Sequence, residues 1–156
     1  MAKILLIEDD FSFQFTLKKL LECFGYTVIV ADNGNDGLTQ HWKNSSIDII
    51  ICDVDMPLLD GFQFLQHLQQ SGKKLPAFAF ISAYLDEAII RKMDSLGADC
   101  VIKKPVDQEI LKIILFALRM KRQARFGHIH PSSRIDNPTA EPHIKQGKGN
   151  SSPCNP

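Results

Sequence analysis

The sequence predicts an α/β domain in which a doubly wound parallel sheet of five strands is covered by helices on both faces. Strand and helix patterns alternate five times along most of the chain. Three strand patterns, at residues 3–8, 48–53 and 77–82, are nearly continuous apolar runs, which are typical of strands buried on both faces. Because crossovers between parallel strands are right-handed, the intervening helices pack on the two sides of the sheet.

The individual elements are expected where the local pattern changes. Strands are predicted at residues 3–8, 26–31, 48–53, 77–82 and 100–103. Helices are predicted around residues 13–24, 38–42, 62–68, 86–96 and 107–125. Gly25 and Gly97 are expected to end the first and fourth helices, because glycine readily adopts the left-handed conformation that often follows a helix. Trp42 is expected to pack its helix against the sheet.

Four of the predicted strands end in reactive side chains. With the flavodoxin-like strand order 2-1-3-4-5, the switch point lies between the first and third strands, so Glu8, Asp9 and Asp53 meet there. Ser82 and Lys104 follow the fourth and fifth strands at the same edge. A cluster of carboxylates with a hydroxyl and a lysine on one rim is suited to a divalent cation and a phosphoryl group.

Composition suggests the domain boundary and excludes several classes of function. A folded domain is expected over residues 1–125, and residues 126–156, which hold five of the eight prolines, are expected to form a disordered tail that contains Pro, Ser and Gly. The formal charge is zero and the tail has no basic cluster, so a DNA partner is not expected. Neither an N-terminal signal nor an apolar run of about 18 residues is present, so we expect a cytoplasmic protein without a membrane partner.

Short motifs follow four of the predicted strands. Each motif alone is weak evidence for a family, but the four in this order form a highly specific combination. They are Glu8-Asp9, Asp53 with Met56-Pro57 and Asp60-Gly61, Ser82-Ala83, and Lys104-Pro105. In this order they resemble the receiver domain of bacterial two-component response regulators, and more closely the stand-alone, chemotaxis-regulator-like members. The resemblance extends from residue 1 to about residue 125.

The resemblance implies a phosphorylation switch centred on Asp53. Asp53 would attack the phosphohistidine of a sensor histidine kinase or phosphotransfer protein and form an acyl phosphate in a Mg²⁺-dependent reaction. Mg²⁺ prefers an octahedron of oxygens and keeps several waters, so Asp9 and Asp53 can bind it directly and Glu8 can hold a coordinated water. By resemblance, the backbone carbonyl of Asp55 is a further ligand. Lys104 would neutralise charge on the phosphoryl group.

The same resemblance implies how the signal leaves the site. Ser82 would donate a hydrogen bond to the phosphoryl group, and its inward movement would alter the surface around the fourth helix, fifth strand and fifth helix. Output would follow through an unknown effector protein, so the domain would catalyse only its own phosphorylation and dephosphorylation. The Lys104-Pro105 peptide bond is expected to be cis, as in that family.

Two positions depart from the family pattern. Val101 stands three residues before the lysine, where an aromatic side chain usually takes part in the switch. Asp55 adds a carboxylate where the family often has a neutral residue, and by resemblance it and Tyr84 flank the path of the water that attacks the phosphate. These two residues are expected to tune the lifetime of the phosphorylated state.

Two other functions remain open. A receiver can also serve as a phosphorelay intermediate or as a phosphate sink without an output partner. The sequence Asp53-Val54-Asp55 after an apolar strand also resembles the Asp-x-Asp motif of haloacid dehalogenase phosphohydrolases. That family needs a further acidic pair beyond the lysine, but here only Asp107 is near. Its Asp-x-Asp motif normally comes first in the chain, whereas here an acidic pair on an earlier strand precedes it.

The last predicted helix carries two apolar stripes. The stripe expected to face the core consists of Ile110, Leu111, Ile114 and Leu118. The second stripe consists of Ile113, Phe116 and Met120, and it lies too far round the helix to face the sheet as well. We interpret it as an exposed effector or dimer surface, which would allow a phosphorylation-dependent homodimer, unless the neighbouring helix or the tail covers it.

Overall fold

A computed structural model, which describes residues 1–44 and 46–126, shows five parallel strands between two layers of helices. The strands are β1 (Lys3–Ile7), β2 (Thr27–Ala31), β3 (Ile49–Asp53), β4 (Ala77–Ser82) and β5 (Cys100–Lys103). The helices are α1 (Phe11–Cys23), α2 (Gly34–Lys43), α3 (Gly61–Gln70), α4 (Glu87–Ser95) and α5 (Gln108–Phe126). The predicted fold class is confirmed, and most boundaries differ from the predictions by one or two residues.

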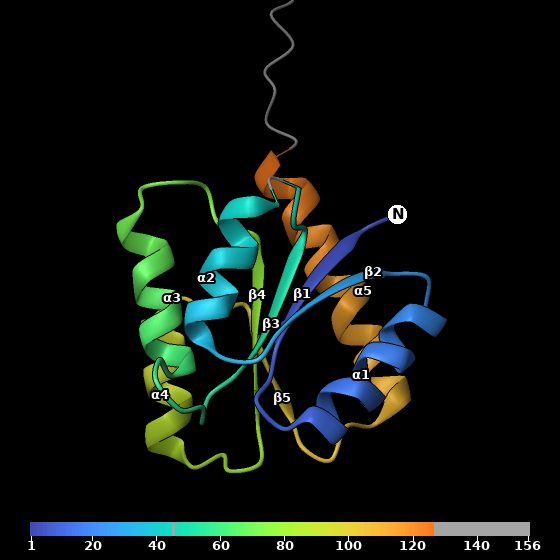
Figure 1. Cartoon of the computed structure of the whole chain (residues 1–156), viewed down its shortest axis with the longest axis horizontal. Coiled ribbons are helices and arrows are strands. Elements are labelled where there is room, and N and C mark those ends of the chain that lie inside the picture. The colour runs from blue at the N-terminus through green and yellow to red at the C-terminus, as the bar shows by residue number, and fades with distance from the viewer. Residues whose placement is uncertain (45, 127–156) are drawn as a thin grey trace, which may run out of the picture.

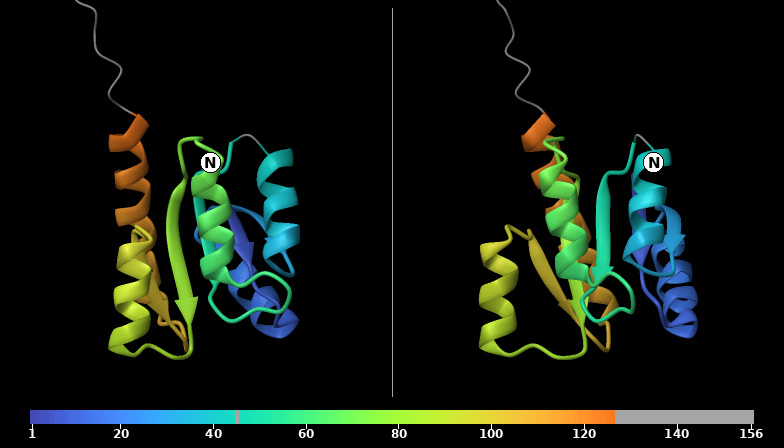
Figure 2. Two further views of the ribbon diagram at one scale, coloured as in Figure 1. Left: turned by 90° about the vertical axis from the view of Figure 1, so that its left-hand side faces the viewer. Right: turned by 60° about the vertical axis from the view of Figure 1, so that its left-hand side comes forward.

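The sheet has the order β2-β1-β3-β4-β5, and every neighbouring pair is parallel. Helices α1 and α5 cover one face, and α2, α3 and α4 cover the other (Figures 1 and 2). This is the flavodoxin-like arrangement, in which the order of connection reverses between β1 and β3. In the register of β1 and β3, Ile7 pairs with Cys52, so Glu8 and Asp53 follow at neighbouring positions.

Both faces of the sheet are buried by alternate residues of the same strands. All five residues of β3 are buried. Ile49 and Ile51 belong to the cluster with α1 and α5, whereas Ile50 and Cys52 belong to the cluster with α2, α3 and α4. Because side chains alternate along a strand, burial on both faces requires a continuous apolar run rather than an alternating one.

Two residues that were predicted to be in the core are exposed. Trp42 is 45% exposed, so the prediction that it packs α2 against the sheet was wrong. It lies in the last turn of α2, where the helix reaches the amino edge of the sheet. Ile110 is 58% exposed, because α5 faces the sheet with Leu111, Leu115 and Leu118.

The second stripe of α5 is exposed, as predicted: Ile113, Phe116 and Met120 are 69%, 66% and 50% exposed. The helix continues to Phe126, one residue beyond the predicted domain boundary. The expectation of a disordered tail concerns residues 127–156, which lie outside the described part of the chain.

Candidate functional site

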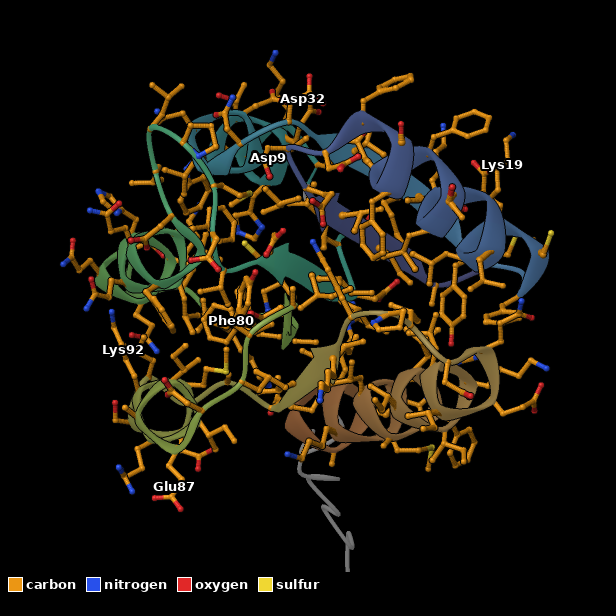
Figure 3. All side chains as sticks on the ribbon, turned by 90° about the horizontal axis from the view of Figure 1, so that it is seen from below. Asp9, Lys19, Asp32, Phe80, Glu87 and Lys92 are labelled. Atoms are coloured by element: carbon orange, nitrogen blue, oxygen red, sulfur yellow. The ribbon has the colours of Figure 1, made fainter. Side chains whose placement is uncertain are left out.

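The carboxyl edge of the sheet brings the predicted acidic residues and lysine together. One carboxylate oxygen each from Glu8, Asp9 and Asp53 lie within 4.8 Å of one another. Lys104 Nζ lies 2.5 Å from Asp53 Oδ2 and 2.8 Å from Glu8 Oε2. These residues come from the ends of β1, β3 and β5, so the register of the parallel strands sets their separation. Figure 3 shows the molecule from this edge, with Asp9 labelled.

Glu8 is the most buried carboxylate of the cluster. Its side chain is 1% exposed, and its Oε2 lies 2.8 Å from the ammonium of Lys104. Burial raises the pKa of Glu8 to about 7; Lys104 opposes this rise, and the charge of Asp53 adds to it. Three carboxylates that crowd around a single lysine repel one another, so the cluster favours a bound cation.

Lys104 is held by contacts on several sides. Burial lowers its pKa, but hydrogen bonds to Asp53 and Glu8 outweigh burial and raise the pKa above its usual value. Its ammonium lies 4.4 Å from the centroid of the Phe13 ring, a cation–π contact. Its backbone N–H donates to the carbonyl of Ser82 at 2.8 Å, and the following peptide bond to Pro105 is cis, as expected. Lys104 is therefore a charged group at a defined position.

Ser82 is fully buried at the end of β4. Its hydroxyl donates to the carbonyl of Tyr84 at 2.8 Å and accepts from the Tyr84 N–H at 3.1 Å. In this conformation Ser82 closes the loop between β4 and α4, and Asp86 rather than Ser82 caps α4. Val101 is half-buried and pairs with Phe80 of the neighbouring strand. A valine therefore stands where the family usually has an aromatic side chain.

The loop from β3 to α3 packs directly against the end of β3. A Cβ on Gly61 would lie 2.2 Å from the carbonyl oxygen of Asp53, so this close approach needs glycine. Asp60 caps α3 in a capping box with Gln63. The Asp55 N–H donates to Asp53 Oδ1 at 3.3 Å. The Asp55 side chain is exposed, and among the described residues its carboxylate does not join the cluster.

Gln14 supports the site and was not singled out from the sequence. This buried side chain donates from Nε2 to the carbonyls of Glu8 and Ala31 at 2.9 and 3.2 Å, and to Asp32 Oδ1 at 3.0 Å. It thereby connects α1 to the ends of β1 and β2 behind the acidic cluster. A polar residue on the apolar face of a helix could have been the signal, whereas Phe13 looked like an ordinary member of that face.

Residues 4–116 match the family model of the response regulator receiver domain. The Regulator of RpoS from Escherichia coli K12 is 34% identical over 116 residues, which cover 74% of this chain and 34% of that protein. The Cyclic di-GMP phosphodiesterase of Thermotoga maritima is 31% identical over 117 residues, which cover 74% of this chain and 31% of that protein. This chain therefore matches about a third of the length of these curated relatives.

Solved structures agree with this match. A receiver domain from Clostridium thermocellum has a TM-score of 0.74 and 28% identity, and the match covers 80% of this chain and 99% of that one. The chemotaxis protein CheY4 of Vibrio cholerae has a TM-score of 0.70 and 28% identity, with 76% and 98% covered.

The chain belongs to the response regulator receiver family, whose members are phosphorylation-switched signalling domains of two-component systems. Receiver domains interact with sensor kinases or phosphotransfer proteins. The acidic cluster at the carboxyl edge could hold a metal ion. Among the described residues, no helix combines the length and the apolar character that a membrane crossing needs.

Proposed function

We propose that this domain accepts a phosphoryl group from a phosphohistidine onto Asp53 and then signals by binding an effector protein. The observation that carries the proposal is the direct contact of Lys104 with Asp53, beside the carboxylates of Glu8 and Asp9. A strand-ending aspartate alone would have many explanations, but a nucleophilic carboxylate next to a fixed cation and a metal-binding cluster is suited to phosphoryl transfer.

The residues of this edge would divide the chemistry between them. Glu8, Asp9 and Asp53, with the backbone carbonyl of Asp55, would hold Mg²⁺, and a bound Mg²⁺ would neutralise charge on the phosphoryl oxygens. An Asp53 oxygen would attack phosphorus while the bond from phosphorus to the donor imidazole breaks and the imidazole takes up a proton. Lys104 would hold a phosphoryl oxygen through its ammonium.

Ser82 would couple the phosphoryl group to the surface. Its hydroxyl now makes two hydrogen bonds with the backbone of Tyr84, and each contributes about 0.5–1.5 kcal/mol. A hydrogen bond to a charged phosphoryl oxygen contributes about 1.5–3 kcal/mol, which is comparable with the two bonds lost and makes the exchange accessible. Because Val101 is too small to replace the usual aromatic, the movement of Ser82 would carry the switch by itself.

Intact mass spectrometry after incubation with acetyl phosphate and Mg²⁺ tests the proposal. We expect one added phosphoryl group, which is absent with EDTA and absent in Asp53→Asn. Asp55→Asn is the matched control, because it changes an exposed carboxylate two residues away and should keep the adduct. An unchanged adduct in Asp53→Asn would overturn the assignment. The proposal also predicts no catalytic turnover of p-nitrophenyl phosphate, which a phosphohydrolase would hydrolyse repeatedly.

A further inference from the structure

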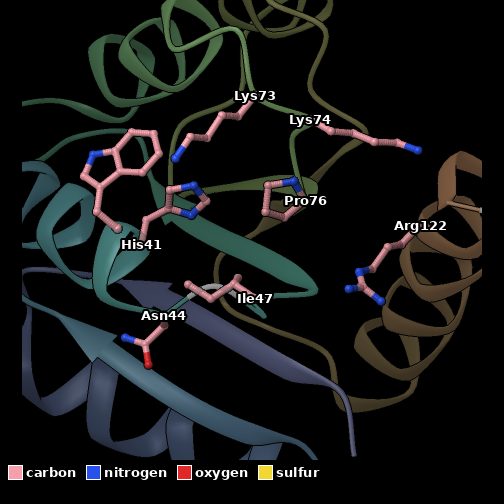
Figure 4. A pocket seen from close by; sticks show the side chains of 8 residues that line it. His41, Asn44, Ile47, Lys73, Lys74, Pro76 and Arg122 are labelled. Carbon is pink, nitrogen blue, oxygen red and sulfur yellow. The ribbon is translucent and has the colours of Figure 1, made fainter.

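A second charged cavity lies at the amino edge of the sheet, formed by the end of α2, the loop between α3 and β4, and α5 (Figure 4). Its volume is about 240 Å³, and its lining includes His41, Trp42, Lys73, Lys74, Pro76 and Arg122. Pro76 directly precedes β4, so this amino-edge cavity is separated from the Asp53 site by the length of a strand.

The lining of the amino-edge cavity is strongly cationic. It includes two lysines and an arginine, and none of its described residues is acidic. Arg122 forms an ion pair with Asp48, whose carboxylate also accepts the backbone N–H of Lys3 at 2.6 Å. In Figure 4, Lys73 extends toward His41, and the guanidinium of Arg122 points from α5 toward the cavity. Lys74 extends away from Lys73 in the same figure, so the cations line the cavity from two sides, and their flexible side chains could close on a phosphate or another anion.

His41 lines the same cavity and carries a polar atom that lacks a partner within the described part of the chain. Its Nδ1 is buried without a hydrogen-bond partner among the described residues. Burial lowers the pKa of His41, and the charge of Lys73 lowers it further, which favours the neutral imidazole. A neutral imidazole has one N–H donor and one acceptor. A buried polar nitrogen without a partner is costly, so a rotation of the ring that brought it to a ligand hydroxyl would be favourable.

Trp42 adds an aromatic surface beside these charges. Lys73 Nζ lies 4.6 Å from the centroid of the indole ring, and the His41 ring meets the indole edge-on at 4.8 Å. These contacts hold the indole in place, yet the residue remains 45% exposed. An exposed aromatic side chain in a cationic surrounding can stack on a flat heterocyclic ring.

From this combination we propose that the amino-edge cavity binds a nucleoside monophosphate. The phosphate would lie among Lys73, Lys74 and Arg122, and the base would stack on the exposed part of Trp42. The cavity is smaller than the roughly 300–1,000 Å³ of pockets that enclose drug-sized ligands. The cavity would therefore hold the phosphate and the sugar but not the whole nucleotide, and the base would lie at the rim. The proposal is independent of phosphoryl transfer, because it uses none of the residues at the carboxyl edge.

Trp42 is the only tryptophan of the chain, so its fluorescence reports directly on this site. The full chain would be titrated with AMP in EDTA, and the affinity confirmed by isothermal titration calorimetry. We expect saturable quenching with AMP, and affinities at least about ten-fold weaker for adenosine and for inorganic phosphate, because each lacks one of the two recognised groups. The double variant Lys73→Ala/Lys74→Ala should weaken AMP binding by at least about ten-fold.

Lys43→Ala is the matched control, because Lys43 is an exposed lysine next to Trp42 that does not line the cavity. Its affinity for AMP should equal that of the wild type. The proposal is overturned if quenching does not saturate, or if the double lysine variant binds AMP as the wild type does. Equal affinity for inorganic phosphate would overturn the nucleoside part, and tighter binding of a single-stranded oligonucleotide would assign the surface to nucleic acid instead. Loss of AMP binding in Asp53→Asn would place the ligand at the carboxyl edge and reject the proposal.

Discussion

The two edges of the sheet carry opposite charges and are built in different ways. At the carboxyl edge Lys104 contacts two carboxylates and a third lies beside them, and the register of parallel strands fixes their spacing. At the amino edge Lys73, Lys74 and Arg122 reach a cavity from a loop and a helix, through long side chains. A site built at strand ends has its geometry set by the backbone, whereas one built from flexible side chains adapts to its ligand. We therefore expect substitutions at the carboxyl edge to have the larger effects.

The largest difference in the rate of Asp53 phosphorylation is expected between substitutions of two lysines, one at each edge. Lys104→Met should slow phosphorylation of Asp53 by acetyl phosphate by about 10²–10³-fold, because a fixed charge at a phosphoryl oxygen contributes on this scale. Lys73→Met should leave the rate unchanged. Rates would be measured by intact mass spectrometry over time, with circular dichroism to confirm that both variants fold. Similar rates in the two variants would contradict the role of Lys104.

Magnesium should stabilise the protein through the carboxyl edge alone. At a Mg²⁺ concentration a hundred times its Kd, the free energy of unfolding should rise by about 2.7 kcal/mol, measured as a shift in Tm. Asp9→Asn should remove most of this shift, since it removes one carboxylate of the cluster. Asp48→Asn, at the other edge, should alter the starting Tm but keep the response to Mg²⁺. If Asp9→Asn responds fully, the metal does not bind at the predicted cluster.

The pH dependence of stability should reveal the strain at Glu8. Its pKa rises from 4.5 to about 7 on folding. Between these values the unfolded chain has lost the proton while the folded chain keeps it, so Glu8 makes the protein less stable as pH rises through this window. In EDTA, the Tm of Glu8→Gln should rise relative to the Tm of the wild type as the pH increases from 5 to about 8. A constant difference between the two proteins across this range would show that Glu8 titrates normally.

The smallest effect on stability and on Asp53 phosphorylation is expected from a substitution on the outer surface of α5. Phe116 is 66% exposed, so Phe116→Asp should change the free energy of unfolding by about 0.5 kcal/mol or less and leave Asp53 phosphorylation intact. Leu115→Ala, at the neighbouring but buried position, should cost about 2–5 kcal/mol.

The functional hypothesis for Phe116 is that the substitution abolishes phosphorylation-dependent partner capture or self-association. Light scattering and pull-down with beryllofluoride-activated protein would measure it. Unfolding by Phe116→Asp would show instead that this stripe is part of the core.

Much of the carboxyl edge could be predicted because its residues follow strands that are recognisable locally. Once the strand order is known, Glu8, Asp9, Asp53 and Lys104 must end at the same edge. Gln14 was missed because two of its three partners are backbone carbonyls, whose direction no sequence pattern reveals. Phe13 was missed because an aromatic residue on an apolar helix face gives no sign that it contacts a lysine far along the chain.

The amino acid sequence by itself determined the alternation of strands and helices, the apolar strands that must be buried on both faces, and the edge at which the acidic residues meet. These properties depend on local periodicity and on the restricted ways in which parallel strands connect. Only the tertiary structure decided that Trp42 and Ile110 are exposed, that Leu115 faces the core, and that Lys73 and Arg122 share a cavity. Those outcomes depend on where each helix ends and how it packs on the sheet, and such distances between remote segments are set by the packed core as a whole.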